Sequence, residues 1–370
     1  MDQLDQQKRL LLTIVISTVV MIVWFQFFAP KPPMEAAADA GALAVAALDG
    51  SQLAAPLAPD AGGAELAVTP PAPEKLLDLT TEAHQLTFTN KGGGLAKALV
   101  EDVGNTWPER KTRSREKDAS GKLLRVDLVR PHPGLDAPGA TELKGEIVLH
   151  RGVAYEAEKT EDGVVFRAVT PQVVVEKRYR VHPKAYELRL EVKVTNRSGA
   201  PKRVDLSLAY PAWIDPKTEK SGGMFSPPPE VAQVICRHES SSEMLVNGTE
   251  DEHKNYPGPV RFAGFDERYF MGVFFPRFEQ GTTCTLQTKA TGEREARIDT
   301  ELGVLGADQT ATREFGLYLG PKEFNELERV SAANAAGMPL TGLGQPVTPG
   351  TSGVGPQLTE AIDFGWWAVI

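Results

Sequence analysis

Residues 10–28 form an uninterrupted apolar run, LLLTIVISTVVMIVWFQFF, that contains no charged side chain. As an α-helix a run of this length spans roughly 28 Å, close to the thickness of the hydrocarbon core of a bilayer. The sequence therefore predicts a transmembrane helix, with Leu10, Ile14, Val20, Trp24 and Phe28 as membrane-anchoring residues. This helix constrains the topology of everything that follows it.

The charges that flank this run predict its orientation. Lys8 and Arg9 precede it, whereas after Lys31 no Lys or Arg occurs before Lys75. The positive-inside rule then leaves residues 1–9 in the cytoplasm and exports the rest. A cleaved secretory signal is the alternative, but its apolar region usually has about 7–15 residues and its cleavage site follows closely. Here the first loose candidate, Ala36-Ala37-Ala38, lies well downstream.

Residues 29–75 are rich in Pro and Ala and almost free of aromatic side chains. Such a segment cannot bury enough apolar area to offset the entropy lost on ordering. We expect a flexible linker here.

From residue 76 onwards apolar residues recur with a period of two. The clearest case is Tyr186–Val194 (YELRLEVKV), with five apolar residues on one face and charges on the other. This alternation is typical of a half-buried antiparallel strand. Residues 269–275 are apolar on both faces, which predicts a central strand between two layers. About a dozen such segments, joined by short turns, predict an all-β fold, a large antiparallel β-sandwich over residues 76–336.

The end of the chain has a different pattern. A helix is predicted near 322–335, with Pro321 in its first turn and with Phe324, Leu327 and Val330 facing the sandwich. Residues 337–358 read as a Gly/Pro-rich loop. Residues 359–370 then turn strongly apolar through Phe364, Trp366 and Trp367, which predicts the start of a second membrane segment that is cut short.

Nothing in the chain has the spacing of a catalytic or cofactor site. Gly92-Gly93-Gly94 lacks the context of a phosphate-binding loop, so a tight turn between strands is the simpler interpretation. The six histidines show no metal-binding spacing, and no hydrolase nucleophile motif occurs. We therefore predict no enzyme, no metal and no cofactor. A net charge of −9 also disfavours a nucleic-acid partner.

Cys236 and Cys284 are the only cysteines, and on the predicted topology both lie outside the membrane. There a disulfide could persist. Two possibilities stay open at this level, a disulfide or two separate core thiols.

Four motifs, in order along the chain, resemble the amino-terminal part of the YidC/Oxa/Alb family of membrane protein insertases. They are Met1–Arg9 (MDQLDQQKR), Thr89–Leu95 (TNKGGGL), Leu317–Lys322 (LYLGPK) and Asp363–Trp367 (DFGWW). The last is the most specific, because it resembles the family's entry into its second transmembrane segment.

This resemblance implies a bacterial inner-membrane protein that is multi-pass in its full length, with a galactose-mutarotase-like β-supersandwich in the periplasm. It implies nascent membrane proteins, the lipid bilayer and the Sec translocon with its accessory subunits as partners. In the family a carboxyl-terminal helix bundle with a hydrophilic groove performs insertion, alone or with the translocon. No residue up to Ile370 matches that groove, so we expect this chain to be the region that precedes it.

Two alternatives of other classes accompany this interpretation. The mutarotase-like fold allows a sugar-binding module, although no convergent carboxylate and histidine pair is visible. A membrane-tethered β-sandwich that docks partner proteins, without an insertase role, is the other.

Overall fold

The structure is a computed structural model, which describes residues 73–101, 103, 113–117, 123–216, 232–239, 241–245, 251–278, 281–338 and 355–362. The predicted anchor, most of the linker, most of the Gly/Pro loop and residues 363–370 lie outside these ranges. No helix among the described residues has the length and hydrophobicity needed to cross a bilayer.

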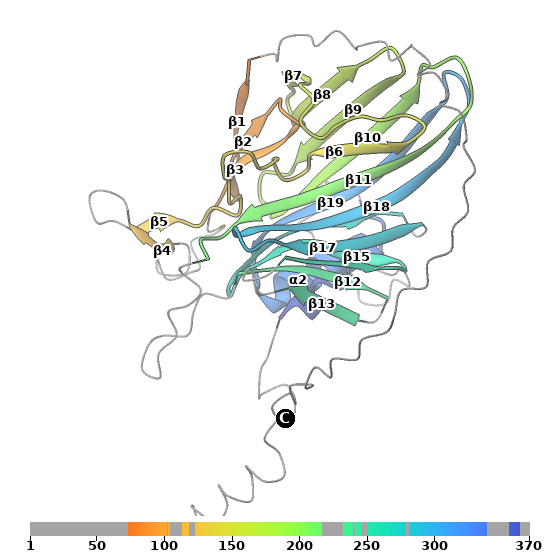
Figure 1. The fold of residues 1–370 in the computed structure, drawn as a ribbon. Coiled ribbons are helices and arrows are strands. Elements are labelled where there is room, and N and C mark those ends of the chain that lie inside the picture. The colour runs from red at the N-terminus through yellow and green to blue at the C-terminus, as the bar shows by residue number, and fades with distance from the viewer. Residues whose placement is uncertain are drawn as a thin grey trace, which may run out of the picture. The chain divides into compact units, whose positions relative to one another are not determined.

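The largest element is a nine-stranded sheet in which every pairing is antiparallel. In spatial order its strands are β13 (Ser241–Leu245), β12 (Gln233–His238), β15 (Val260–Asp266), β16 (Phe270–Pro276), β19 (Thr310–Pro321), β10 (Glu187–Asn196), β9 (Val173–Val181), β8 (Gly163–Val169) and β7 (Glu156–Lys159). Its centre therefore joins β10 to β19, two strands that are far apart in the sequence (Figure 1).

Three smaller antiparallel sheets complete the β-structure. A five-stranded sheet has the order β14 (Glu252–Tyr256), β17 (Thr282–Thr288), β18 (Glu293–Leu305), β11 (Lys202–Trp213) and β6 (Thr141–Gly145). A three-stranded sheet contains β1 (Leu76–Thr80), β2 (His84–Thr89) and β3 (Gly94–Val100). A hairpin joins β4 (Arg113–Lys117) to β5 (Leu123–Arg125).

Two of these sheets cover different parts of one face of the nine-stranded sheet. Tyr210 of the five-stranded sheet contacts the rings of Phe265 and Phe274. Phe88 of the three-stranded sheet contacts Phe166 and Tyr179. All six aromatic side chains are buried, so the main core lies between these layers and the predicted antiparallel β-sandwich is confirmed.

The opposite face of the nine-stranded sheet carries helix α2 (Phe324–Ala335) and the short 3₁₀-helix η4 (Leu358–Ala361). Strand β16 therefore has a layer on each side, as predicted from its apolar sequence. Phe274 faces Tyr210, while Phe275 lies over Gly316 on the other face.

Helix α2 begins later than predicted. Pro321 ends β19, where it pairs with Phe270, so its placement in the first helical turn was wrong. The pairing of β19 with β10 has already ended at Tyr318, so the missing N–H of Pro321 costs the sheet no hydrogen bond on that side. Leu327 and Val330 are buried as predicted, but Phe324 is 47% exposed.

The glycine run forms the predicted turn between β2 and β3. Gly92 and Gly93 have φ angles of +69° and +57°, in the left-handed region where glycine carries no steric penalty. The fully buried Lys177 of β9 holds this turn, because its Nζ donates to Gly92 O at 2.8 Å and also to Gly93 O and Gly139 O.

Lysine side chains also bridge two sheet edges. Lys75 Nζ donates to Ala157 O of β7 at 3.0 Å, and Lys159 Nζ donates to Asp78 O of β1 at 2.8 Å. The edge strand β7 itself exposes Glu156, Glu158 and Lys159.

His84 joins the three-stranded sheet to β19, since its Nε2 lies 2.6 Å from Leu319 O. Burial lowers the pKa of His84 to about 4, an effect that the bond to Leu319 O partly opposes. The folded state thus binds this proton less tightly than the unfolded state does. Stability contributed by neutral His84 is therefore complete above the unfolded pKa of about 6.5 and is lost as pH falls toward the folded value.

We expect the free energy of unfolding to fall by about 2–3 kcal/mol from this group between about pH 7.5 and pH 4.5. Urea unfolding of the full chain in detergent, followed by circular dichroism, measures the loss. His84→Gln keeps an N–H donor for Leu319 O but does not titrate, so it should lose less stability over the same interval. An equal loss in both proteins would contradict this assignment.

Candidate functional site at the carboxyl-terminal helix

The site begins with the apolar stripe that seats α2 on the nine-stranded sheet. Leu327, Val330 and Ala333 recur every third residue and are fully or almost fully buried. This spacing places them on one face of the helix. On the same helix, Arg329 pairs with Glu326 one turn earlier through Nη2 and Oε1 at 2.5 Å. This apolar stripe is the face by which the helix packs on the sheet.

A buried ionic cluster lies beneath the second half of α2. Glu187 and Arg189, both from β10, pair at 2.6 Å between Oε1 and Nε, with exposed fractions of 0% and 2%. Asn334 of α2 donates to Glu187 Oε2 at 2.9 Å and accepts from Arg277. The Arg277 guanidinium also lies 3.3 Å from Glu314 Oε1. Glu187 of β10 and Arg277, directly after β16, thus both bind one helical residue, and Glu314 of β19 joins the cluster through Arg277.

The electrostatics of this cluster centre on Glu187. Burial raises the pKa of its carboxyl, while the Asn334 hydrogen bond and the positive charge of Arg277 act in the opposite direction. Such a group is costly to bury unless all its partners are in place. The cluster therefore couples the position of α2 to the sheet.

The chain that enters α2 is anchored by a second buried pair. Lys322 Nζ lies 2.9 Å from Asp266 Oδ1, and their side chains are 9% and 3% exposed. Gln233 donates to Asp266 Oδ2 at 2.9 Å, and Lys322 N donates to Tyr269 O at 2.7 Å. Both ends of the helix are consequently tied to strands of the same sheet.

After α2 the chain turns sharply. Gly337 has φ +65° and donates to Asn334 O, and Met338 N donates to Ala333 O. This is the hydrogen-bond pattern of a Schellman cap. Arg189 Nη2 donates to Met338 O at 3.3 Å, so a hydrogen bond connects the buried cluster to the residue that closes the cap.

The chain returns to the same helix at η4. Leu358 N donates to Ser331 Oγ at 2.9 Å, and Leu358 and Ala361 are buried. Arg237 of β12 lies 3.9 Å from Glu360. We call α2, η4 and the buried side chains beneath them the platform. The platform fixes the chain up to residue 362, so the first four residues of the stretch 359–370, predicted as the start of a second membrane segment, belong to the platform.

The residues predicted as sites from the sequence lie mostly elsewhere. The anchor residues Leu10, Ile14, Val20, Trp24 and Phe28 lie outside the described residues, as do Phe364, Trp366 and Trp367. The structure joins Cys236 of β12 to Cys284 of β17 by a disulfide. Within the described ranges, no cluster of three or more His, Cys, Asp or Glu side chains has metal-binding geometry.

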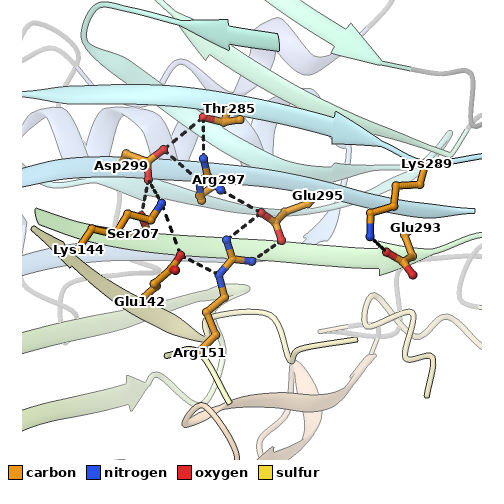
Figure 2. Close-up of polar contacts among 10 residues, drawn as sticks. All are labelled: Glu142, Lys144, Arg151, Ser207, Thr285, Lys289, Glu293, Glu295, Arg297 and Asp299. Atoms are coloured by element: carbon orange, nitrogen blue, oxygen red, sulfur yellow. Dashed lines mark hydrogen bonds and ion pairs between the residues drawn. The ribbon is translucent and has the colours of Figure 1, made fainter. Parts of the chain in front are cut away.

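A second group of charged side chains covers the five-stranded sheet (Figure 2). Arg151 binds Glu295 through both guanidinium Nη atoms, and Arg297 lies 3.0 Å from Asp299 and 3.7 Å from Glu295. Lys144 lies 3.6 Å from Asp299. The acids and bases alternate, so the network pairs its own charges and is best explained as a solvated, ordered face.

Comparison with known proteins decides the family. The family model for the YidC periplasmic domain matches residues 136–370, which is more than half of the chain. The chain belongs to the YidC membrane protein insertase family. This confirms the resemblance that its sequence motifs indicated.

Individual YidC relatives agree. A membrane protein insertase YidC from Anaeromyxobacter sp. (strain Fw109-5) is 30% identical over 334 residues, which cover 87% of this chain and 57% of the relative. The YidC of Syntrophus aciditrophicus (strain SB) is 24% identical over 377 residues, covering 97% of this chain and 62% of the relative. The chain thus spans a little over half the length of the first curated relatives that it matches.

Solved structures that match the chain include a galactose mutarotase-like protein from Lactobacillus casei ATCC 334, with a TM-score of 0.41 and 9% identity. It matches 66% of this chain and 100% of its own. A putative aldose 1-epimerase from Escherichia coli K12 has a TM-score of 0.39 and 10% identity over 67% of this chain and 99% of its own. Membership of the YidC family favours the insertase interpretation over a sugar-binding or docking module without an insertase role.

Proposed function

We propose that this chain is the amino-terminal region of an insertase that inserts and folds proteins of the bacterial inner membrane, alone or with the Sec translocon. Residues 10–28 anchor it, residues 29–75 tether the β-sandwich in the periplasm, and residues 359–370 lead back into the bilayer. Nascent membrane proteins are its substrates. The relatives carry the name insertase, which supports a non-covalent role in membrane protein insertion.

One observation carries the role that we assign to the sandwich. Before the 339–354 segment, Lys322 and Asn334 tie the chain to the nine-stranded sheet, and after it Leu358 ties the chain to helix α2. The chain that leads back into the bilayer after residue 362 would therefore start from a fixed point rather than from a free loop. The sandwich acts as a rigid base that sets where the following membrane helices enter.

Complementation in cells depleted of their own insertase tests this proposal. The longer protein that carries this chain should restore insertion of a reporter membrane protein, measured by pulse labelling and protease protection. Asn334→Leu removes the hydrogen bonds of α2 to Glu187 and Arg277, so insertion should fall several-fold.

Lys193→Met is the matched control, because Lys193 lies on β10 like Glu187 and Arg189 but is 41% exposed. It should leave insertion unchanged. Protease resistance of the sandwich distinguishes two cases: a sandwich that stays resistant is folded and has lost only its platform, whereas a sandwich that is degraded is misfolded. If Asn334→Leu opens residues 324–338 to proteolysis while insertion stays at the level of the unchanged protein, the sandwich is not the base that we propose.

A further inference from the structure

The disulfide links the two large layers of the sandwich. Cys236 belongs to the nine-stranded sheet and Cys284 to the five-stranded sheet, with Cα atoms 6.5 Å apart and 48 residues between them in sequence. Neither cysteine lies in an edge strand. Cys236 pairs with Glu243 and Ala263 on its two sides, and Cys284 pairs with Tyr256 and Ile298.

Both cysteines have an exposed fraction of 0%. Thiol–disulfide exchange requires a thiolate to attack one sulfur of the bond in a mixed-disulfide step, so the attacking group must reach that sulfur. In the folded sandwich the sheets themselves fill that approach. Exchange at this bond therefore needs the layers to separate.

The order of the chain supplies a stage at which the cysteines are still accessible. Strand β19 (Thr310–Pro321) follows both cysteines in sequence and lies between β16 and β10 in the nine-stranded sheet. A chain that emerges from its amino terminus presents Cys236 and Cys284 before β19. Until β19 arrives, the nine-stranded sheet lacks its central strand and the core cannot close.

We propose that the Cys236–Cys284 bond is made before the sandwich closes, by a disulfide-bearing oxidant that acts on the incompletely folded chain. One cysteine thiolate attacks the oxidant's disulfide and displaces one of its thiolates. The second cysteine thiolate then attacks this mixed disulfide and releases the other. Two electrons pass to the oxidant, the cysteines lose two protons to solvent, and the two released thiolates take up two protons from solvent, so that the oxidant leaves as a dithiol. Once folded, the domain neither gains nor loses the bond. This inference is independent of the insertase assignment.

The rate of reduction by dithiothreitol tests the proposal on the full chain purified in detergent without reductant. After denaturation, the chain should take up no maleimide until it is reduced. Under native conditions, reduction should be at least about a thousandfold slower than for an exposed disulfide, and it should accelerate with urea as steeply as global unfolding does. Free thiols in the purified chain would overturn the proposal. Reduction that is fast, or whose rate does not change with urea, would also overturn it, because it would show that local opening gives the reductant access to the disulfide.

The matched control is Val169→Cys in the Cys236→Ser/Cys284→Ser background, carried as a mixed disulfide with glutathione. Val169 is 59% exposed, so this disulfide reports the unprotected rate. A second arm refolds the reduced chain and adds glutathione disulfide. Oxidation that is slow and proceeds at the rate of global unfolding supports the proposal. A reduced chain that refolds only after its cysteines have been oxidised in denaturant supports it as well. Rapid oxidation of a refolded, reduced chain overturns it.

Discussion

Replacement of Arg189 by methionine is expected to lower the free energy of unfolding at about pH 8 by about 3–5 kcal/mol, because it leaves the buried carboxyl of Glu187 without its ionic partner. Glu187 is fully buried, and its remaining direct hydrogen bond comes from Asn334 of α2. Urea unfolding of the full chain in detergent measures the change. Protease cleavage within 324–338 should increase at the same time, since the orphaned carboxylate weakens the seat of the helix.

The effect of Arg189→Met should depend on pH in a defined direction. Burial already holds the pKa of Glu187 above its usual value, so the folded state binds this proton more tightly than the unfolded state does. The stability that this group contributes is lost as pH rises from its unfolded pKa to its higher folded pKa. Removal of the positive charge of Arg189 raises the folded pKa further, so the loss extends to higher pH. The variant should therefore be less destabilised at about pH 5 than at about pH 8.

Two further proteins make this prediction specific. The double variant Glu187→Gln/Arg189→Met removes both charges and should recover part of the loss. Arg178→Met on β9 breaks a pair with Asp162 whose side chains are 42% and 44% exposed, so it should cost at most about 1 kcal/mol. Equal losses for Arg189→Met and Arg178→Met would show that the buried cluster does not hold the platform.

Lys177→Met should lower the free energy of unfolding by about 2–5 kcal/mol, because buried carbonyl oxygens lose their donor. Gly92 O and Gly139 O accept from Lys177, whereas Gly93 O keeps a second donor in the Tyr179 hydroxyl at 3.2 Å. Burial lowers the pKa of Lys177, so part of the loss is offset by removal of a poorly solvated ammonium. Thermal or urea unfolding in detergent measures the net effect.

Lys193→Met serves as the control for Lys177→Met, since it makes the same substitution at a partly exposed site of the same sheet. Its free energy of unfolding should stay within about 0.5 kcal/mol of that of the unchanged chain. If the two variants have the same free energy of unfolding, the hydrogen bonds of Lys177 to the glycine turn do not stabilise the fold.

The period-two pattern predicted the strands well, because one face of each is apolar whatever lies on the other. It could not predict what covers the polar face. In β10 the charged side chains Glu191 and Lys193 are partly exposed as the pattern indicates, but Glu187 and Arg189 lie buried beneath α2. The alternating pattern indicates which face of a strand is polar. Whether the polar face of β10 is buried depends on helix α2, which lies more than 120 residues later in the chain.

The platform was only partly predictable for a similar reason. Leu327 and Val330 followed from helical periodicity, but Asn334 is unremarkable in sequence and gains its role from two distant residues, Glu187 and Arg277. The position of Pro321 misled the prediction, because proline is equally tolerated at the end of a strand and in the first turn of a helix. The spacing Asn334, Gly337 and Met338 was the available signal for the helix end.

The lysine bridges at the sheet edges have a consequence for the membrane-anchored protein that we propose. Proteins held by a bilayer meet neighbours repeatedly at the same height, so their effective concentration is high. An open strand edge under those conditions invites pairing between copies. Because Lys159 and Lys75 occupy carbonyl oxygens at the gap between β1 and β7, and Glu156 and Glu158 charge the outer strand, that side repels another strand. Copies of the domain can then pass one another laterally without joining into a continuous sheet.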